Sequence, residues 1–142
     1  MSFSTILSAA IDGLGVELVR VEADVSNGLP VFHMVGYLSS EVKEAGERVR
    51  TAIRNSGFEY PAKRTVINLS PATLRKRGAS FDLPIAVAIL ASLGQVGMAG
   101  SGRCLIIGEL GLDGQVRKVP GILPIVMEGK EAGVTRYIVP KE

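Results

Sequence analysis

One Gly-Lys pair in the chain invites comparison with the phosphate-binding loop of nucleotide hydrolases. That loop needs the pattern G-x-x-x-x-G-K-[ST], because backbone amides and the lysine together surround the phosphates. Here the pair is Gly129-Lys130, but Glu131 follows where Ser or Thr is needed, and Pro124 stands where the first glycine belongs. The sequence therefore predicts that this chain does not hydrolyse ATP by that route.

A serine hydrolase needs a proton acceptor beside its serine, and His33 is the single histidine of the chain. A Ser-His-Asp site would require it as the base. It lies between Phe32 and Met34 in a predicted strand, which is typical of a packed or edge residue. Ser80 is the candidate nucleophile. Its place directly before an apolar helix also predicts a helix N-cap, and we favour that interpretation.

Metal binding would require carboxylates from separate segments to converge. Asp82, Glu109 and Asp113 are the candidates, yet nothing in their spacing requires them to meet, and solvated turn residues are commoner. Cys104 is the single cysteine, which excludes an internal disulfide and a cysteine-based metal cluster. We expect this chain to bind neither a metal nor a cofactor.

Basic residues bracket one predicted strand and the segment after it: Lys63, Arg64, Arg75, Lys76 and Arg77. Side chains placed this way can meet phosphates without reading base sequence, so they are the candidates for nucleic-acid contact. A solvated basic face explains the run equally well. Phe58 and Tyr60 are the nearby aromatic candidates for stacking on bases, and both also fit a core position.

The elements that position these residues begin with strands. Residues 3–11 are β-prone, and apolar and charged residues alternate over 19–25, which predicts a strand with one buried face. Asn27-Gly28 has the residues of a type I′ turn, so 30–35 is expected to return as the second strand of a hairpin.

Helical spacing follows over 42–53, with a serine cap at 39 or 40 and Gly57 at the end. Within this helix, Glu44 and Arg48 are predicted to form an ion pair. The remaining pattern predicts a strand over 65–69, a short helix over 70–78, a buried helix over 80–93, a hairpin of strands 103–109 and 115–119, a helix over 121–132 and a strand over 137–139. This order predicts a single α+β domain (mixed α/β) over residues 1–142, with helices packed on a mixed sheet.

Composition indicates a globular domain, with 46% hydrophobic and 21% charged residues. The longest apolar runs, near 83–93 and 105–107, fall far short of the roughly 20 residues that a membrane helix needs. No basic region precedes an apolar stretch at the start, so we expect no secretory signal, no membrane contact and a cytoplasmic location. A net charge of +2 does not indicate a nucleic-acid partner by itself. The chain stops directly after a predicted strand, so we expect it to be part of a longer protein.

Nearly the whole chain carries, in order, short segments with a shared likeness: Ser26-Asn27-Gly28-Leu29-Pro30, Val35-Gly36, Val42-Lys43-Glu44, Arg48-Val49-Arg50, Asn55-Ser56-Gly57-Phe58-Glu59-Tyr60-Pro61, Asn68-Leu69-Ser70-Pro71-Ala72, Phe81-Asp82-Leu83-Pro84-Ile85-Ala86, Gly108-Glu109-Leu110, Pro120-Gly121 and Ile138-Val139-Pro140-Lys141-Glu142. Together they resemble the amino-terminal part of magnesium-chelatase-like proteins of the competence protein ComM type.

The resemblance implies a fold similar to the second domain of ribosomal protein S5, which the Lon protease catalytic domain shares. In that family this region precedes an AAA+ ATPase module. The family implies a hexameric motor that acts on DNA in branch migration during natural transformation. ATP and Mg²⁺ would bind in the ATPase module, outside this chain. The implied partners are that module, neighbouring subunits and DNA.

The likeness to Lon proteases points to one pair of segments. Lon proteases use a serine turn, similar to Gly78-Ala79-Ser80-Phe81-Asp82, and a lysine from a later segment, similar to Pro120-Gly121-Ile122-Leu123. Leu123 stands at the place of the lysine, and leucine cannot take a proton from a serine hydroxyl. Lys130 lies two helical turns further on, about 10 Å along the axis. We therefore expect no peptidase activity, with Ser80 a vestigial position.

Three functions stay open at this point. The first is an accessory domain that packs against the ATPase ring and helps it to engage DNA. The second is a residual hydrolase that depends on Ser80. The third is a pure protein-interaction module with Leu38, Met98 or Leu112 as surface contacts, which an exposed apolar patch would favour.

Overall fold

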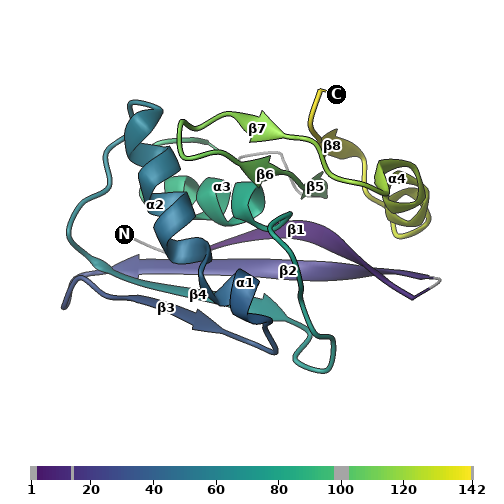
Figure 1. Ribbon diagram of the computed structural model, residues 1–142, viewed down its shortest axis with the longest axis horizontal. Coiled ribbons are helices and arrows are strands. Elements are labelled where there is room, and N and C mark those ends of the chain that lie inside the picture. Colours follow the sequence, from purple (N-terminus) through teal and green to yellow (C-terminus); the bar gives the residue numbers. More distant parts are fainter. Residues whose placement is uncertain (1–2, 14, 98–102, 142) are drawn as a thin grey trace.

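A six-stranded mixed sheet forms the centre of the computed structural model, which describes residues 3–13, 15–97 and 103–141 (Figure 1). The strand order is β3-β4-β2-β1-β5-β8. These strands are β1 (Phe3–Asp12), β2 (Gly15–Ser26), β3 (Phe32–Val35), β4 (Arg64–Ser70), β5 (Cys104–Ile106) and β8 (Arg136–Ile138). Neighbours β1–β2 and β2–β4 are antiparallel, whereas β3–β4, β1–β5 and β5–β8 are parallel. The predicted mixed α/β fold is confirmed.

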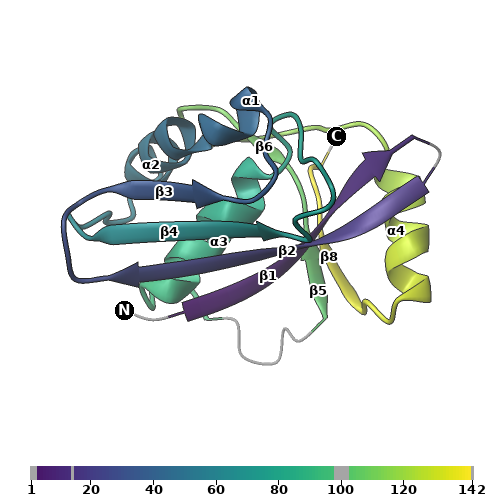
Figure 2. The same ribbon diagram turned by 90° about the horizontal axis from the view of Figure 1, so that it is seen from below.

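Helices pack against both faces of the sheet. They are α1 (Ser40–Lys43), α2 (Ala45–Asn55), α3 (Asp82–Ser92) and α4 (Ile122–Glu131). Helices α2 and α3 lie on the same side of the sheet in Figure 1, and Figure 2 shows the opposite face of β1–β4 in front of them. Helix α4 lies apart from these two, beside the far end of the β1–β2 hairpin.

Side-chain alternation in β2 decides which face becomes the core. Val19, Val21 and Val25 are buried, while Arg20 and Asp24 on the other face are exposed, as the period of two predicts. Helix α3 packs on the buried face, and its apolar side chains point both to the sheet and to α2, which explains why its sequence is apolar all round.

The predicted hairpin between 19–25 and 30–35 is wrong. Strand β3 exists, but it pairs in parallel with β4, and β4 occupies the place beside β2. The Asn27-Gly28 turn therefore leads across one strand position rather than back along the neighbouring strand. Turn residues predict that the chain reverses, but they do not determine which strand pairs with which.

The predicted ion pair and single helix at 40–57 also need correction. Ser39 caps α1 as predicted, since its hydroxyl accepts a hydrogen bond from the Val42 amide at 3.3 Å. The helix breaks at Glu44 into α1 and α2, and Gly57 follows α2 with φ of 88°. Glu44 does not pair with Arg48, whose guanidinium is bound to Asp82 instead.

No helix forms over 70–78, where the sequence predicted one. The Lys76 amide donates to the Tyr37 carbonyl at 2.8 Å, and the Lys76 carbonyl accepts from the Ser39 amide at 2.9 Å. These bonds create an isolated parallel bridge between Leu38 and Lys76, which requires an extended backbone at that point. Long-range pairing therefore overrides the local proline and glycine signals.

The carboxyl-terminal half follows the prediction more closely. Strand β5 ends at Ile106, and the predicted hairpin is the shorter pair of β6 (Glu109–Leu110) and β7 (Val116–Arg117). Helix α4 and strand β8 are confirmed. Ser80 is not the N-cap of α3: Phe81 holds that position without a side-chain cap, and the Ser80 carbonyl accepts from the Gly108 amide instead.

Candidate functional site

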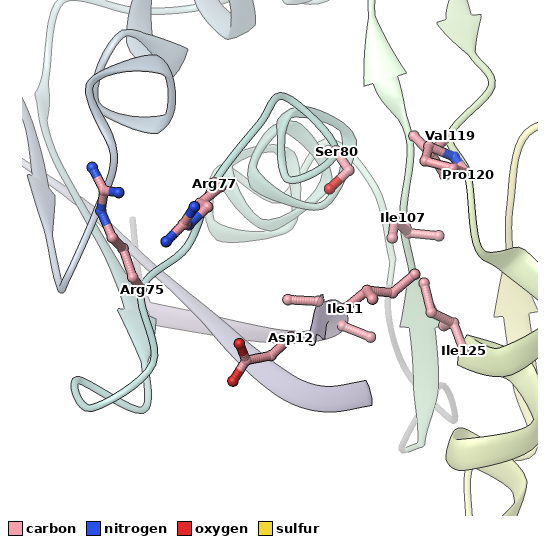
Figure 3. Close-up of a pocket in the computed structure, with 11 residues that line it drawn as sticks. Ile11, Asp12, Arg75, Arg77, Ser80, Ile107, Val119, Pro120 and Ile125 are labelled. Carbon is pink, nitrogen blue, oxygen red and sulfur yellow. The ribbon is translucent and has the colours of Figure 1, made fainter. Parts of the chain in front are cut away.

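A small cleft of about 150 Å³ brings together the two segments that the Lon likeness singled out (Figure 3). Ser80 lines it from the turn before α3, and Pro120 lines it from the turn before α4. The end of β1 closes the cleft below them. The other lining residues come from these elements and their neighbours: Ala9, Ala10, Ile11, Asp12, Arg75, Arg77, Ile107, Val119 and Ile125.

Asp12 is the one proton acceptor among the side chains that line this cleft. Leu123 does not line it, and with 70% of its surface exposed it faces solvent. Arg75 and Arg77 do line it, but a guanidinium stays protonated and cannot act as a base. Figure 3 shows the Asp12 carboxylate turned away from Ser80.

Lys130 does not take the place of the lysine that Leu123 replaces. It lines a separate hollow between α4 and the start of β2, beside Met127 and Val16. His33 does not line the Ser80 cleft either. It is exposed on the edge strand β3, as the sequence predicted. Among the described side chains that line the Ser80 cleft, no lysine or histidine stands beside the serine.

The five basic candidates do not form one cluster. Lys63 and Arg64 stand at the start of β4, whereas Arg75 and Arg77 follow its end. A seven-residue strand spans about 23 Å at roughly 3.3 Å per residue, so the two groups lie at opposite ends of the sheet. Arg64, Arg75 and Arg77 are exposed and Lys63 is half-buried, so these four remain accessible to an anion.

Lys76 has to be removed from the nucleic-acid candidates. Its side chain is fully buried, and its ammonium donates to the Pro71 carbonyl. Burial lowers the pKa of Lys76, because the charged form loses its hydration. The residue fixes the loop after β4 and does not present a charge to a partner.

A buried ion pair, which the sequence did not predict, ties α2 to α3. Arg48 Nε lies 2.6 Å from Asp82 Oδ2, and a second nitrogen lies 3.0 Å from Oδ1, so the contact is bidentate. The Asp82 side chain is only 1% exposed. Burial raises the pKa of Asp82, and the Arg48 guanidinium opposes that rise. Asp82 thus has a structural partner rather than a metal.

The remaining candidates are the metal ligands and the apolar surface contacts. Across the described residues, no three His, Cys, Asp or Glu side chains gather to hold a metal ion. Of the predicted surface contacts, Leu38 is buried and hence wrong, Leu112 is 56% exposed, and Met98 lies outside the described residues. A search of the described helices finds none long and apolar enough to span a membrane.

Comparison with known proteins assigns the chain to a family. The sequence model of the family described as subunit ChlI of Mg-chelatase matches residues 21–142. The chain belongs to this family.

Its similarity to individual proteins agrees with this assignment. The chain is 44% identical over 133 residues to the uncharacterized protein YifB of Salmonella typhimurium, covering 94% of this chain and 26% of that protein. It is 42% identical over 132 residues to the competence protein ComM of Haemophilus influenzae, covering 93% of this chain and 26% of that protein. The chain thus spans about a quarter of the length of these relatives.

A more distant likeness bears on the serine cleft. The chain is 24% identical over 138 residues to the Lon protease of Mycolicibacterium smegmatis, covering 93% of this chain and 18% of that protein. The predicted resemblance to ComM-type proteins, and more distantly to Lon, is therefore confirmed.

Sequence reasoning missed two arginines of α2 that lie near Lys63. These residues are Arg50 and Arg54. Together with Lys63 they line a second cleft at the start of β4. The segment at 58–60 could have indicated this cleft. It follows α2 and contains Tyr60, whose ring lies under the Arg54 guanidinium.

Proposed function

We propose that this chain is a non-catalytic accessory domain of a ComM-like AAA+ ATPase that processes DNA in the cytoplasm, as in branch migration during natural transformation. It would couple the ATPase ring to DNA or to neighbouring subunits of a hexamer. The chain corresponds to about a quarter of the ComM relative, which leaves ample length for an ATPase module. ATP and Mg²⁺ would bind in that module.

A leucine at the place of the Lon lysine is the observation that carries this proposal. The chain keeps the segments that the Lon likeness aligns with a serine and a lysine, and both segments border one cleft. The residue at the place of the lysine is a leucine that faces solvent. A serine without a base is a poor nucleophile, so a scaffold role fits this arrangement better than hydrolysis.

Helix α4 carries the surface best suited to contact another part of the motor. Leu123 and Met127, one turn apart, are 70% and 61% exposed. Neighbouring apolar side chains left in solvent are typical of interaction sites. This observation also supports the second candidate function, a module that acts through protein contacts alone.

ATP hydrolysis by the full-length protein tests the proposal. Replacing Leu123 and Met127 by serine should reduce DNA-stimulated hydrolysis several-fold while basal hydrolysis is retained, because only the coupling contact is lost. Phe3→Ser is the matched control: Phe3 is 60% exposed but lies at the opposite end of the sheet from α4, as Figure 2 shows for the N-terminus.

Two results would contradict the proposed function. One is a full-length protein that does not hydrolyse ATP. The other is DNA stimulation that is unchanged when Leu123 and Met127 are replaced. If stimulation by DNA is absent from the wild-type protein but subunit assembly fails in the α4 variant, the interaction module is the better description.

A further inference from the structure

A cationic cleft of about 210 Å³ lies at the start of β4, at the opposite end of that strand from the Ser80 cleft. Arg50 and Arg54 enter it from α2, and Lys63 enters it from the segment before β4. The remaining lining is uncharged: Pro30, Val31, Tyr60, Pro61 and Ala62. Arg64, the next residue after Lys63, does not line the cleft, and its side chain lies against Gly28.

Much of the positive charge in this cationic cleft is not neutralised. Arg50 binds Glu47 at 2.6 Å, whereas no carboxylate of the described residues lies within 4.0 Å of Arg54 or Lys63. The Lys63 ammonium donates to the Asn27 side-chain oxygen at 2.8 Å, a neutral partner. Two cations that face one small space without counter-charges favour an anion there.

The cationic cleft is also held in shape before any ligand arrives. The Arg54 guanidinium lies 5.7 Å from the centre of the Tyr60 ring, and the Tyr60 hydroxyl is hydrogen-bonded to Thr65 at 2.8 Å. Two hydrogen bonds of 3.1 and 2.7 Å join the Glu59 backbone to the Gln95 side chain. A site whose side chains are already positioned loses less entropy on binding.

We infer that this cationic cleft binds a phosphate of a polynucleotide backbone. Its volume is below the roughly 300–1,000 Å³ of pockets that enclose a whole small molecule, so it fits one group of a larger ligand. Guanidinium groups pair well with phosphate oxygens, and the phosphates of a polynucleotide repeat at regular spacing along the strand. A peptide carboxylate supplies one charge without a regularly spaced neighbour. The inference rests on the proposed function, since it names the site through which this domain would meet DNA.

The test measures binding of a fluorescent oligothymidylate to the chain over a series of salt concentrations. Arg54→Ala/Lys63→Ala should weaken binding about tenfold or more and lower the salt slope by about 0.7, which is the contribution of one phosphate contact on a single strand. Arg75→Ala/Arg77→Ala is the matched control, because it removes the same charge at the other end of β4. It should change the affinity far less. Thermal unfolding checks that both variants remain folded.

Three outcomes would overturn the inference: no binding by the wild-type chain at micromolar concentration, equal losses in the two double variants, or competition by polyglutamate as strong as that by unlabelled oligothymidylate. The last outcome would assign the cleft to an acidic peptide. These failures are separable from those of the proposed function, which depends on ATP hydrolysis by the full-length protein. Cleft-dependent DNA binding in a protein without ATPase activity would overturn the function alone.

Discussion

Replacing Arg48 by alanine is expected to lower the free energy of unfolding by about 3–5 kcal/mol. Its guanidinium makes two bonds to Asp82, whose side chain is 1% exposed. Removing Arg48 leaves the Asp82 carboxylate buried without a counter-charge. This costs more free energy than the intact ion pair contributes to stability. Urea denaturation followed by circular dichroism measures the change.

The same helix offers a control for the Arg48 prediction. Glu47 pairs with Arg50 at a similar distance of 2.6 Å, but the Glu47 side chain is 84% exposed. Glu47→Ala should therefore cost no more than about 1 kcal/mol. Adding Asp82→Asn to Arg48→Ala should recover part of the loss, because a neutral amide is cheaper to bury. Similar losses in Arg48→Ala and Glu47→Ala would contradict the account.

Replacing Phe81 by alanine is expected to cost about 3–5 kcal/mol, the usual range for a fully buried phenylalanine. Phe81 is 1% exposed and stands at the N-cap of α3, directly after Ser80. Its ring joins the main core, so the substitution both opens a cavity and frees the turn that shapes the Ser80 cleft. Thermal and urea unfolding of the variant measure the loss.

Phe58→Ala provides the matched comparison for Phe81→Ala. Phe58 is 37% exposed at the surface end of α2, so the same change of side chain should cost less than half as much. Equal destabilisation by the two substitutions would show that burial at position 81 does not anchor the serine turn.

Local sequence patterns predicted the parts of the fold that depend on local physics. The alternation in β2, the serine cap of α1 and the apolar character of α3 each follow from residues within one element. The failures all involve partners that are distant in the chain. Asn27-Gly28 signals a reversal, but the neighbour of β2 is β4, which begins almost forty residues later.

The candidate site shows the same division. Ser80 and Pro120, from the two segments that the likeness to Lon singled out, both line one cleft. Charge alone could not tell Lys76 from Arg75, because the bridge to Leu38 that buries Lys76 comes from another element. Likewise, Arg50, Arg54 and Lys63 line one cleft only because the loop before β4 passes the end of α2, which the pattern within one element does not reveal.

The central claim is that this domain keeps the serine turn of a Lon-like scaffold without its chemistry, and peptide hydrolysis tests it most directly. Purified wild-type chain and Ser80→Ala are incubated with fluorogenic peptides and an unfolded protein substrate, and cleavage is followed over time. The account predicts no cleavage above background in either sample, because Leu123 stands at the place of the lysine and the Asp12 carboxylate is turned away from Ser80. Hydrolysis by the wild-type chain that disappears in Ser80→Ala would contradict it and show a catalytic domain.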